Sequence, residues 1–182
     1  MSRSIFAIPL MLMLLAGCGP NDPTIERPGD RQDGSADKAD PAALAAGKGY
    51  VLPTEPAASK GVIDVRKLAK DGDEVVVVGR VGGSSKPFTE GRAAFLLVDA
   101  SFTPGDCECP WDYCETDRKE LVAGRLSVKF VGADGKTVVN GARGMFGIKE
   151  LSTVVVRGKV QRDDKDNVIV VASGIFVRPD QP

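Results

Sequence analysis

The sequence contains no histidine among its 182 residues, and this absence excludes several kinds of chemistry. Histidine is the commonest general base and the commonest nitrogen ligand of metal ions in proteins. Without it, serine–histidine and cysteine–histidine nucleophile pairs are impossible, as are zinc sites that need two imidazoles. We therefore predict that the protein is not an enzyme, and the sequence indicates no cofactor.

An excess of positive charge is also missing. The chain has 24 Lys and Arg residues against 25 Asp and Glu residues, so its formal net charge is −1. A protein that holds nucleic acid by neutralising phosphates usually carries a clear basic excess. Nucleic acid is therefore an unlikely main partner.

The N-terminus has the pattern of a secretory signal. A short basic start is followed by an apolar run from Ile5 to Ala16, which has the length of a signal-peptide core and is too short to span a bilayer. We predict that residues 1–17 are a signal peptide and that the protein is exported.

The apolar run ends in Leu15-Ala16-Gly17-Cys18, which resembles the lipobox of bacterial lipoproteins. The resemblance implies that the Cys18 thiol receives a diacylglyceryl group and that the chain is cut just before this residue. Several acyl chains together give stable membrane anchoring. Gly19 follows the cysteine where an aspartate would favour the inner membrane in some bacteria, so we expect an outer-membrane anchor and a domain in the periplasm or at the cell surface.

Residues 18–60 are rich in Pro, Ala, Gly and Asp and nearly free of large apolar side chains. Such a segment buries too little surface to offset the entropy lost on ordering. We expect a flexible, disordered linker, in which residues 42–46 form a helical turn or two without packing on the domain. The remaining residues, 61–182, form the predicted domain.

The domain shows a mainly β pattern with one or two short helices. An amphipathic helix is predicted from Val62 to Lys70 and a second short helix within residues 141–149, with a tight turn at Asp134-Gly135. Alternating or valine-rich runs predict five strands, at residues 74–81, 93–99, 125–131, 153–162 and 168–177.

Five strands with a helix before the fourth are the order of an OB-like fold, a small five-stranded Greek-key barrel. Gly79 in the first strand and Gly158 in the fourth lie in similar valine-rich contexts. Glycine weakens a strand, so two at matching places indicate sharp bends where a barrel turns. The alternative is a simple antiparallel sheet with incidental glycines.

The loop between the second and third strands holds Cys107, Cys109 and Cys114. Outside the cytoplasm, clustered cysteines most often form disulfides. Cys107–Cys114 and Cys109–Cys114 are both open, and either leaves one cysteine over. The alternative is a thiolate site for Cu(I) or Zn built from these three residues, with Asp112 as a candidate fourth ligand, or a redox function.

The same loop carries Trp111 and Tyr113. Aromatic rings of OB-folds often stack on oligosaccharides or single-stranded nucleic acid, so capture of a glycan or peptide is one hypothesis. The other is that both rings fill the inside of the loop and cover the end of the barrel. Arg80 and Arg157 are further candidates, because they could attract an anionic ligand to one barrel face. Asp163-Asp-Lys-Asp166 is acidic but lacks the ligand spacing of a calcium loop, which favours a solvated turn.

Residues 61–178 resemble a group of uncharacterised OB-fold-like envelope lipoproteins of planctomycete-type bacteria. The resemblance is carried by Gly79-Arg-Val-Gly-Gly83, Ala94-Phe-Leu-Leu-Val-Asp99 and, most specifically, Pro110-Trp-Asp-Tyr-Cys114. It implies a fold and a location but no activity. The function we expect is a lipid-anchored, non-enzymatic binding or scaffolding module of the cell envelope, with an envelope protein, a peptide or a glycan as ligand.

Overall fold

The computed structural model describes residues 41–179 of the chain. The predicted signal peptide, the lipidation site Cys18 and the first half of the predicted linker lie outside the described residues. Within residues 41–179, no helix combines the length and the apolar character that a membrane crossing requires.

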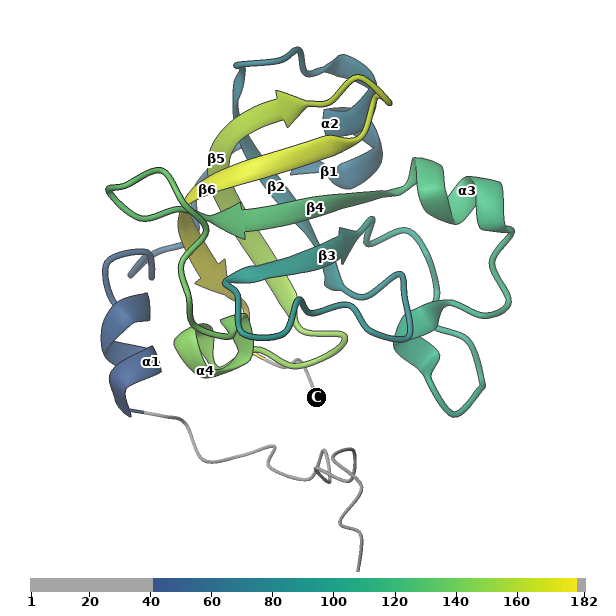
Figure 1. Ribbon diagram of the computed structural model, residues 1–182. Coiled ribbons are helices and arrows are strands. Elements are labelled where there is room, and N and C mark those ends of the chain that lie inside the picture. The colour runs from purple at the N-terminus through teal and green to yellow at the C-terminus, as the bar shows by residue number, and fades with distance from the viewer. Residues whose placement is uncertain (1–40, 180–182) are drawn as a thin grey trace, which may run out of the picture. The chain divides into compact units, whose positions relative to one another are not determined.

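The described chain folds around a closed, mainly β barrel (Figure 1). Its five strands, in the order of the sequence, are β2 (Glu74–Val81), β3 (Ala94–Val98), β4 (Arg125–Phe130), β5 (Thr153–Arg162) and β6 (Val168–Val177). The strands neighbour one another in the order β2-β3-β4-β6-β5, and pairing of β2 with β5 closes the ring. β4 and β6 are parallel, whereas the other neighbours in the ring are antiparallel. A sixth strand, β1 (Lys60–Gly61), pairs in parallel with the middle of β2 and is not part of the ring.

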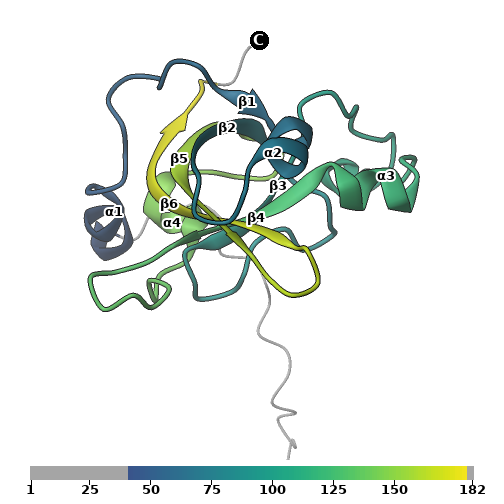
Figure 2. The ribbon, with the colours of Figure 1, turned by 90° about the horizontal axis from the view of Figure 1, so that it is seen from above.

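This arrangement confirms the predicted OB-like fold. The five barrel strands lie where the sequence patterns placed them, and the short helix α4 (Ala142–Phe146) precedes the fourth barrel strand as expected. Figures 1 and 2 show α4 at one end of the barrel and α2 (Val62–Leu68) at the other. The predicted turn at Gly135 is also present, since Gly135 has φ +73° and the flanking residues Val131 and Thr137 pair with each other.

Alternation along the strands builds the core. Valines fill most inward positions of β2, β5 and β6, where β-branched side chains pack well on a pleated surface, and larger residues come from β3, β4 and α4. Phe95 and Phe130 lie side by side in the barrel, and the Phe146 ring of α4 contacts Phe130 with a centroid distance of 4.5 Å. α4 thus plugs one end of the barrel with its apolar face.

The two glycines that the sequence marked as bends are required by close backbone approaches. A Cβ atom on Gly79 would lie 2.5 Å from the Val98 carbonyl oxygen, and one on Gly158 would lie 2.4 Å from the Val171 carbonyl oxygen. The pairing of β5 with β6 shifts register between Arg157 and Gly158, which is a β-bulge. Bulges and glycines let strongly curved strands close a small barrel, so the predicted role of these glycines is confirmed.

The linker prediction is wrong for the part of residues 18–60 that the structure describes. Residues 41–47 form helix α1 (Pro41–Gly47), which packs on α4 through small side chains. Ala43 is buried, and a Cβ on Gly47 would lie 2.1 Å from the Met145 carbonyl oxygen. The following chain pairs with β6, because the backbone of Ile175 exchanges hydrogen bonds with Tyr50 and Leu52 at 2.8 Å each. Small residues let α1 lie close to α4, and such a contact does not need the large apolar side chains on which the linker prediction was based.

Asp99 joins α2 to the end of β3. Its carboxylate accepts hydrogen bonds from the backbone N–H groups of Ile63, at 2.9 Å, and Ser101, at 3.0 Å, so it satisfies a free donor in the first turn of α2. The residue is only 8 % exposed. Burial opposes ionisation, but the backbone donors outweigh it, and the pKa of Asp99 lies below its usual value.

We predict that Asp99→Asn lowers the free energy of unfolding by about 1–3 kcal/mol at pH 7, because an amide offers one acceptor oxygen where two N–H donors need one each. The pKa of Asp99 is lower in the folded than in the unfolded chain, where it is about 3.9. The stabilisation is therefore present above pH 4 and is lost as the pH falls through the folded-state pKa. Urea unfolding from pH 7 to pH 2 should show the two proteins converging in acid. A difference that stays constant with pH would contradict this role.

Candidate functional site

A groove of about 740 Å³ lies on the outside of the barrel. Its floor crosses three neighbouring strands, since Leu96 of β3 lies opposite Ser127 of β4, which in turn lies opposite Ile169 of β6. Ala94 and Lys129 form the adjacent row. In OB-folds the second and third strands form the usual ligand face, and here these strands are β3 and β4.

Two loops form the walls of the groove. The loop between β2 and β3 contributes Lys86, Pro87, Thr89 and Arg92, and the turn that follows β4 contributes Gly135, Lys136 and Thr137. The Arg92 guanidinium lies 3.5 Å from the Thr137 carbonyl oxygen, where the two walls meet. We call this surface the basic groove, after its four cations Lys86, Arg92, Lys129 and Lys136.

The four cations of the basic groove have no anionic partner in the part of the chain that the structure describes. No carboxylate is among the described residues that line the groove. Lys129 donates to the neutral Gln161 side chain at 2.8 Å, and none of the four forms an ion pair with a described Asp or Glu. Other basic side chains of the domain do, for example Arg162 with Asp166 and Arg178 with Glu55. The carboxylate of Asp134 accepts a hydrogen bond from the Lys136 backbone N–H at 3.0 Å, but this residue does not line the groove. The described lining of the groove therefore carries four positive charges and no negative one.

The floor of the groove is apolar but offers no ring for stacking. Leu96 and Ile169 are half-buried. Phe95 is the aromatic residue among the described lining residues, and its side chain is 2 % exposed because it points into the core. A ligand in the groove would meet aliphatic groups below and cations at the sides.

The cysteine-containing loop braces one wall of this groove. The Trp111 carbonyl accepts a hydrogen bond from the Gly83 N–H at 2.7 Å, and the indole N–H of Trp111 donates to the Ser85 carbonyl at 3.2 Å. From the other side, the Arg125 guanidinium donates to the Gly83 carbonyl at 2.6 Å. Lys86 follows Ser85 in the sequence, so the hydrogen bonds of Trp111 help to position the part of the β2–β3 loop that carries Lys86.

Gly82 and Gly83 make this contact possible. A Cβ on Gly82 would lie 2.7 Å from the Trp111 carbonyl oxygen, and Gly83 has φ +88°, a conformation that strains other residues. Two of the three motifs that carried the family resemblance, Gly79–Gly83 and Pro110–Cys114, are thus in direct contact. Together they hold the backbone of the loop that carries Lys86.

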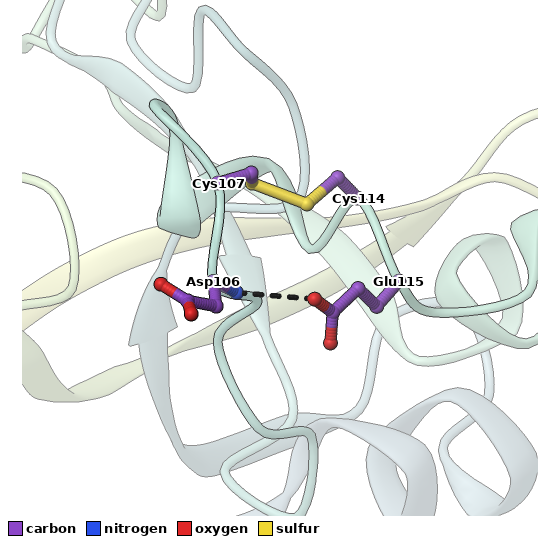
Figure 3. Close-up of a disulfide and its surroundings, with 4 residues drawn as sticks. All are labelled: Asp106, Cys107, Cys114 and Glu115. Atoms are coloured by element: carbon purple, nitrogen blue, oxygen red, sulfur yellow. Dashed lines mark hydrogen bonds between the residues drawn. A yellow bond between two sulfur atoms is a disulfide. The ribbon is translucent and has the colours of Figure 1, made fainter.

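The cysteine pairing is Cys107–Cys114, one of the two pairings that the sequence left open (Figure 3). The Asp106 N–H donates to the Glu115 carboxylate at 3.3 Å, next to the disulfide. Cys109 is the cysteine left over, and its side chain is half-buried. With two of the three sulfur atoms bonded to each other, the three cysteines are not available together as thiolates in this state, and the metal and redox alternatives stay predictions. The described residues also contain no group of three acidic or sulfur ligands suited to a metal ion.

Tyr113 is a core residue and not an exposed ring. It is 1 % exposed and packs with Val98, Leu121 and Phe102 in a small cluster under the loop. Within the described residues its hydroxyl forms no hydrogen bond of acceptable geometry, although the Arg80 guanidinium lies close to it. Burial raises the pKa of the Tyr113 phenol, and the nearby Arg80 guanidinium offsets part of this rise. The ring thus fills the inside of the loop, as one of the two predictions has it, and its burial leaves no ring face open to a ligand in this state.

The loop is built from two short helical elements. Trp111 and Asp112 lie half-buried in the 3-10 turn η1 (Pro110–Asp112). The second element is helix α3 (Arg118–Ala123), and neither element was predicted from the sequence. Asp117 caps α3, because its side chain accepts hydrogen bonds from the N–H groups of Lys119 and Glu120. α3 contributes Leu121 to the cluster around Tyr113.

The structure does not bring Arg80 and Arg157 together. Arg80 lies opposite Thr153, whereas Arg157 lies opposite Val76, four positions away along the β2–β5 pair. This separation corresponds to about 13 Å. Arg80 lines a second cleft of about 580 Å³, but its guanidinium donates to the Phe102 carbonyl, and Arg178 in the same cleft is paired with Glu55. Because the separation along the strands is an even number of positions, the two arginines point to the same face of the β2–β5 pair, as expected, but they do not share a cleft, and anion binding by them stays a prediction.

The acidic stretch after β5 is a turn, as expected. Asp163 accepts hydrogen bonds from the N–H groups of Lys165 and Asn167 and from the Asn167 side chain. Asn167 holds the pKa of the Asp163 carboxyl below its usual range. The carboxylate thus closes the turn itself.

Comparisons with known proteins identify no family. No family model matches the chain, and no curated protein matches it, so the likeness to envelope lipoproteins stays a prediction. Among solved structures, the chain is similar to "OBody AM1L10 bound to hen egg-white lysozyme" with 15 % identity and a TM-score of 0.40, over 71 % of this chain and 100 % of that one. We draw no functional argument from this similarity.

We predict that Tyr113→Phe leaves the free energy of unfolding within about 0.5 kcal/mol of the original or raises it, because it removes a buried hydroxyl that forms no hydrogen bond of acceptable geometry within the described residues. Tyr113→Ala should lower it by about 3 kcal/mol or more, since it leaves a cavity under the loop. Urea unfolding under non-reducing conditions measures both. A loss of several kcal/mol in Tyr113→Phe would show that the hydroxyl is engaged and would contradict the assignment.

Proposed function

We propose that this protein is a lipid-anchored, non-enzymatic binding module of the bacterial cell envelope, and that the basic groove is its ligand-contacting surface. The observation that carries the proposal is the combination of an apolar floor, on the strands that OB-folds commonly use for ligands, with four cations that form no ion pair with a described carboxylate. An outer-membrane anchor remains the preferred location, on the strength of Cys18 and Gly19.

Binding accounts for the groove better than catalysis does. Its described lining offers lysine, arginine and hydroxyl side chains, with no carboxylate to activate a hydroxyl as a nucleophile. The chain has no histidine to supply that base from elsewhere. Cations beside a half-buried aliphatic floor are suited to holding a ligand that carries negative charge.

A disulfide-closed loop supports the same proposal. Trp111 fixes the backbone that precedes Lys86, and Tyr113 anchors the loop in its own apolar cluster. Rigid positioning of contact residues reduces the entropy lost when a ligand binds. The loop thereby acts as a brace for the groove, and the ligand need not touch the tryptophan or tyrosine ring.

The anchor can be tested with labelled fatty acid. We predict that cells grown with radiolabelled palmitate incorporate label into the protein and retain it in the membrane fraction, because the Cys18 thiol accepts the lipid. Cys18→Ala should lose both properties, and Cys109→Ala, the matched control, should keep both. Labelling and membrane retention of Cys18→Ala would overturn the anchor.

The binding surface can be tested by photo-crosslinking in intact cells. We predict that p-benzoylphenylalanine in place of Lys136, on the rim of the basic groove, gives defined adducts of higher mass after irradiation. The same residue in place of Lys159, which is exposed on β5 outside the groove, serves as the control. Adducts from Lys136 but not from Lys159 are expected. Equal patterns at the two positions, or none at Lys136, would contradict the groove as a contact surface.

A further inference from the structure

We infer that the ligand of the basic groove is an extended, acidic peptide segment of a partner protein, with carboxylates alternating with apolar side chains. The inference rests on the proposed binding function and adds the chemical class of the ligand. It follows from three properties of the groove: the sign and placement of its charges, the character of its floor and its width.

The charges come from three segments around the floor. Lys86 and Arg92 come from the loop between β2 and β3, Lys136 comes from the turn after β4, and Lys129 comes from the floor itself. A ligand that lies on the floor therefore meets cations from all three segments. Its carboxylates would pair with cations that form no ion pair with a described carboxylate.

The floor selects for apolar groups between those carboxylates. Leu96 and Ile169 flank Ser127 in one cross-strand row, and all three are half-buried. Side chains of an extended peptide point alternately to opposite sides. A segment that alternates acidic and aliphatic residues would place its aliphatic side chains on Leu96 and Ile169. Its carboxylates would then point away from the floor, where the long lysine and arginine side chains around the groove can reach them.

The width of the floor fits one extended chain. It runs from β3 across β4 to β6, which is two interstrand spacings, or about 10 Å. The volume of about 740 Å³ accommodates a short segment and not a folded domain. The groove therefore suits an unstructured tail or an exposed loop of a partner.

Other anionic polymers fit the groove less well. Single-stranded nucleic acid is usually held by bases stacked on aromatic side chains, and sugar rings likewise present flat faces that pack on such rings. Among the described lining residues the aromatic side chain is that of Phe95, which is buried in the barrel. A sulfated glycan would satisfy the cations but would leave the aliphatic floor without a partner.

The test uses residues 19–182 exported behind a cleavable signal peptide, so that every described residue is kept and the Cys107–Cys114 disulfide can form. The probe is a short fluorescein-labelled peptide in which glutamate alternates with leucine and alanine, followed by fluorescence anisotropy. We expect saturable binding that weakens as salt shortens the screening length from about 10 Å at 0.1 M to about 3 Å at 1 M. The same peptide with glutamine for glutamate should not bind.

Charge reversal locates the site. Lys86→Glu with Lys136→Glu should weaken binding of the acidic peptide by about tenfold or more, because two attractions become repulsions. The matched control, Lys119→Glu with Lys159→Glu, makes the same change in net charge outside the groove and should leave the affinity within about twofold. Urea unfolding of both double variants verifies that the fold is retained.

Competition distinguishes the ligand classes. A heparin octasaccharide, a short oligothymidylate and phosphatidylglycerol vesicles are titrated against the same protein. The inference is overturned if the acidic peptide does not bind, if its binding is unaffected by the groove reversals, or if one of the three competitors binds in a groove-dependent way and the peptide does not. Adducts at Lys136 in cells together with a failed peptide titration would leave the groove as a binding surface and reject the peptide class alone.

Discussion

Closure of the barrel by the pairing of β2 with β5 is the constraint on which the rest of the structure depends. Seven residue pairs, from Glu74 with Lys159 to Arg80 with Thr153, join the first and the fourth barrel strands. Closure of so small a ring requires strong bends, and Gly79 and Gly158 allow the neighbouring backbones to approach where a Cβ would collide with a carbonyl oxygen. Once the ring is closed, β3, β4 and β6 present a continuous outer face, and the floor of the basic groove is that face.

The fold was largely readable from the sequence because its signals are local. Valine-rich and alternating runs, together with flanking turn residues, place β2, β5 and β6 at the bounds that the structure shows. Other features were not predicted, for physical reasons. The helical turn of α1 was expected but its packing was not, because it packs through Ala43 and Gly47, whose small size makes the contact close but leaves no apolar stripe in the sequence. α3 is a short polar helix whose main signal is its cap at Asp117.

The basic groove could not be predicted in the same way, because its cations come from three separate segments. Lys86, Lys129 and Lys136 are unremarkable in the sequence, and a barrel of known register is needed to bring them to one surface. One partial signal was present: Lys129 and Ser127 occupy the outward face of the alternating strand β4. By contrast, the residues that looked most distinctive, Trp111, Tyr113 and the cysteines, support the groove and do not line it.

The distribution of charge distinguishes the basic groove from the rest of the described surface. The chain contains as many acidic as basic residues to within one, and in the described part several arginines are matched with carboxylates, Arg143 with Glu150 among them. In the groove, four cations share one concave surface and the described chain places no carboxylate among them. Like charges gathered in this way raise the energy of the folded state, slightly at each exposed site but in the same direction at all four. An anionic ligand relieves that repulsion as it binds, so the electrostatic cost of keeping the groove empty becomes part of the affinity for the ligand. Because the floor beneath the charges is aliphatic, a ligand that also carries apolar groups gains from both surfaces at once, whereas a purely ionic one gains from the cations alone.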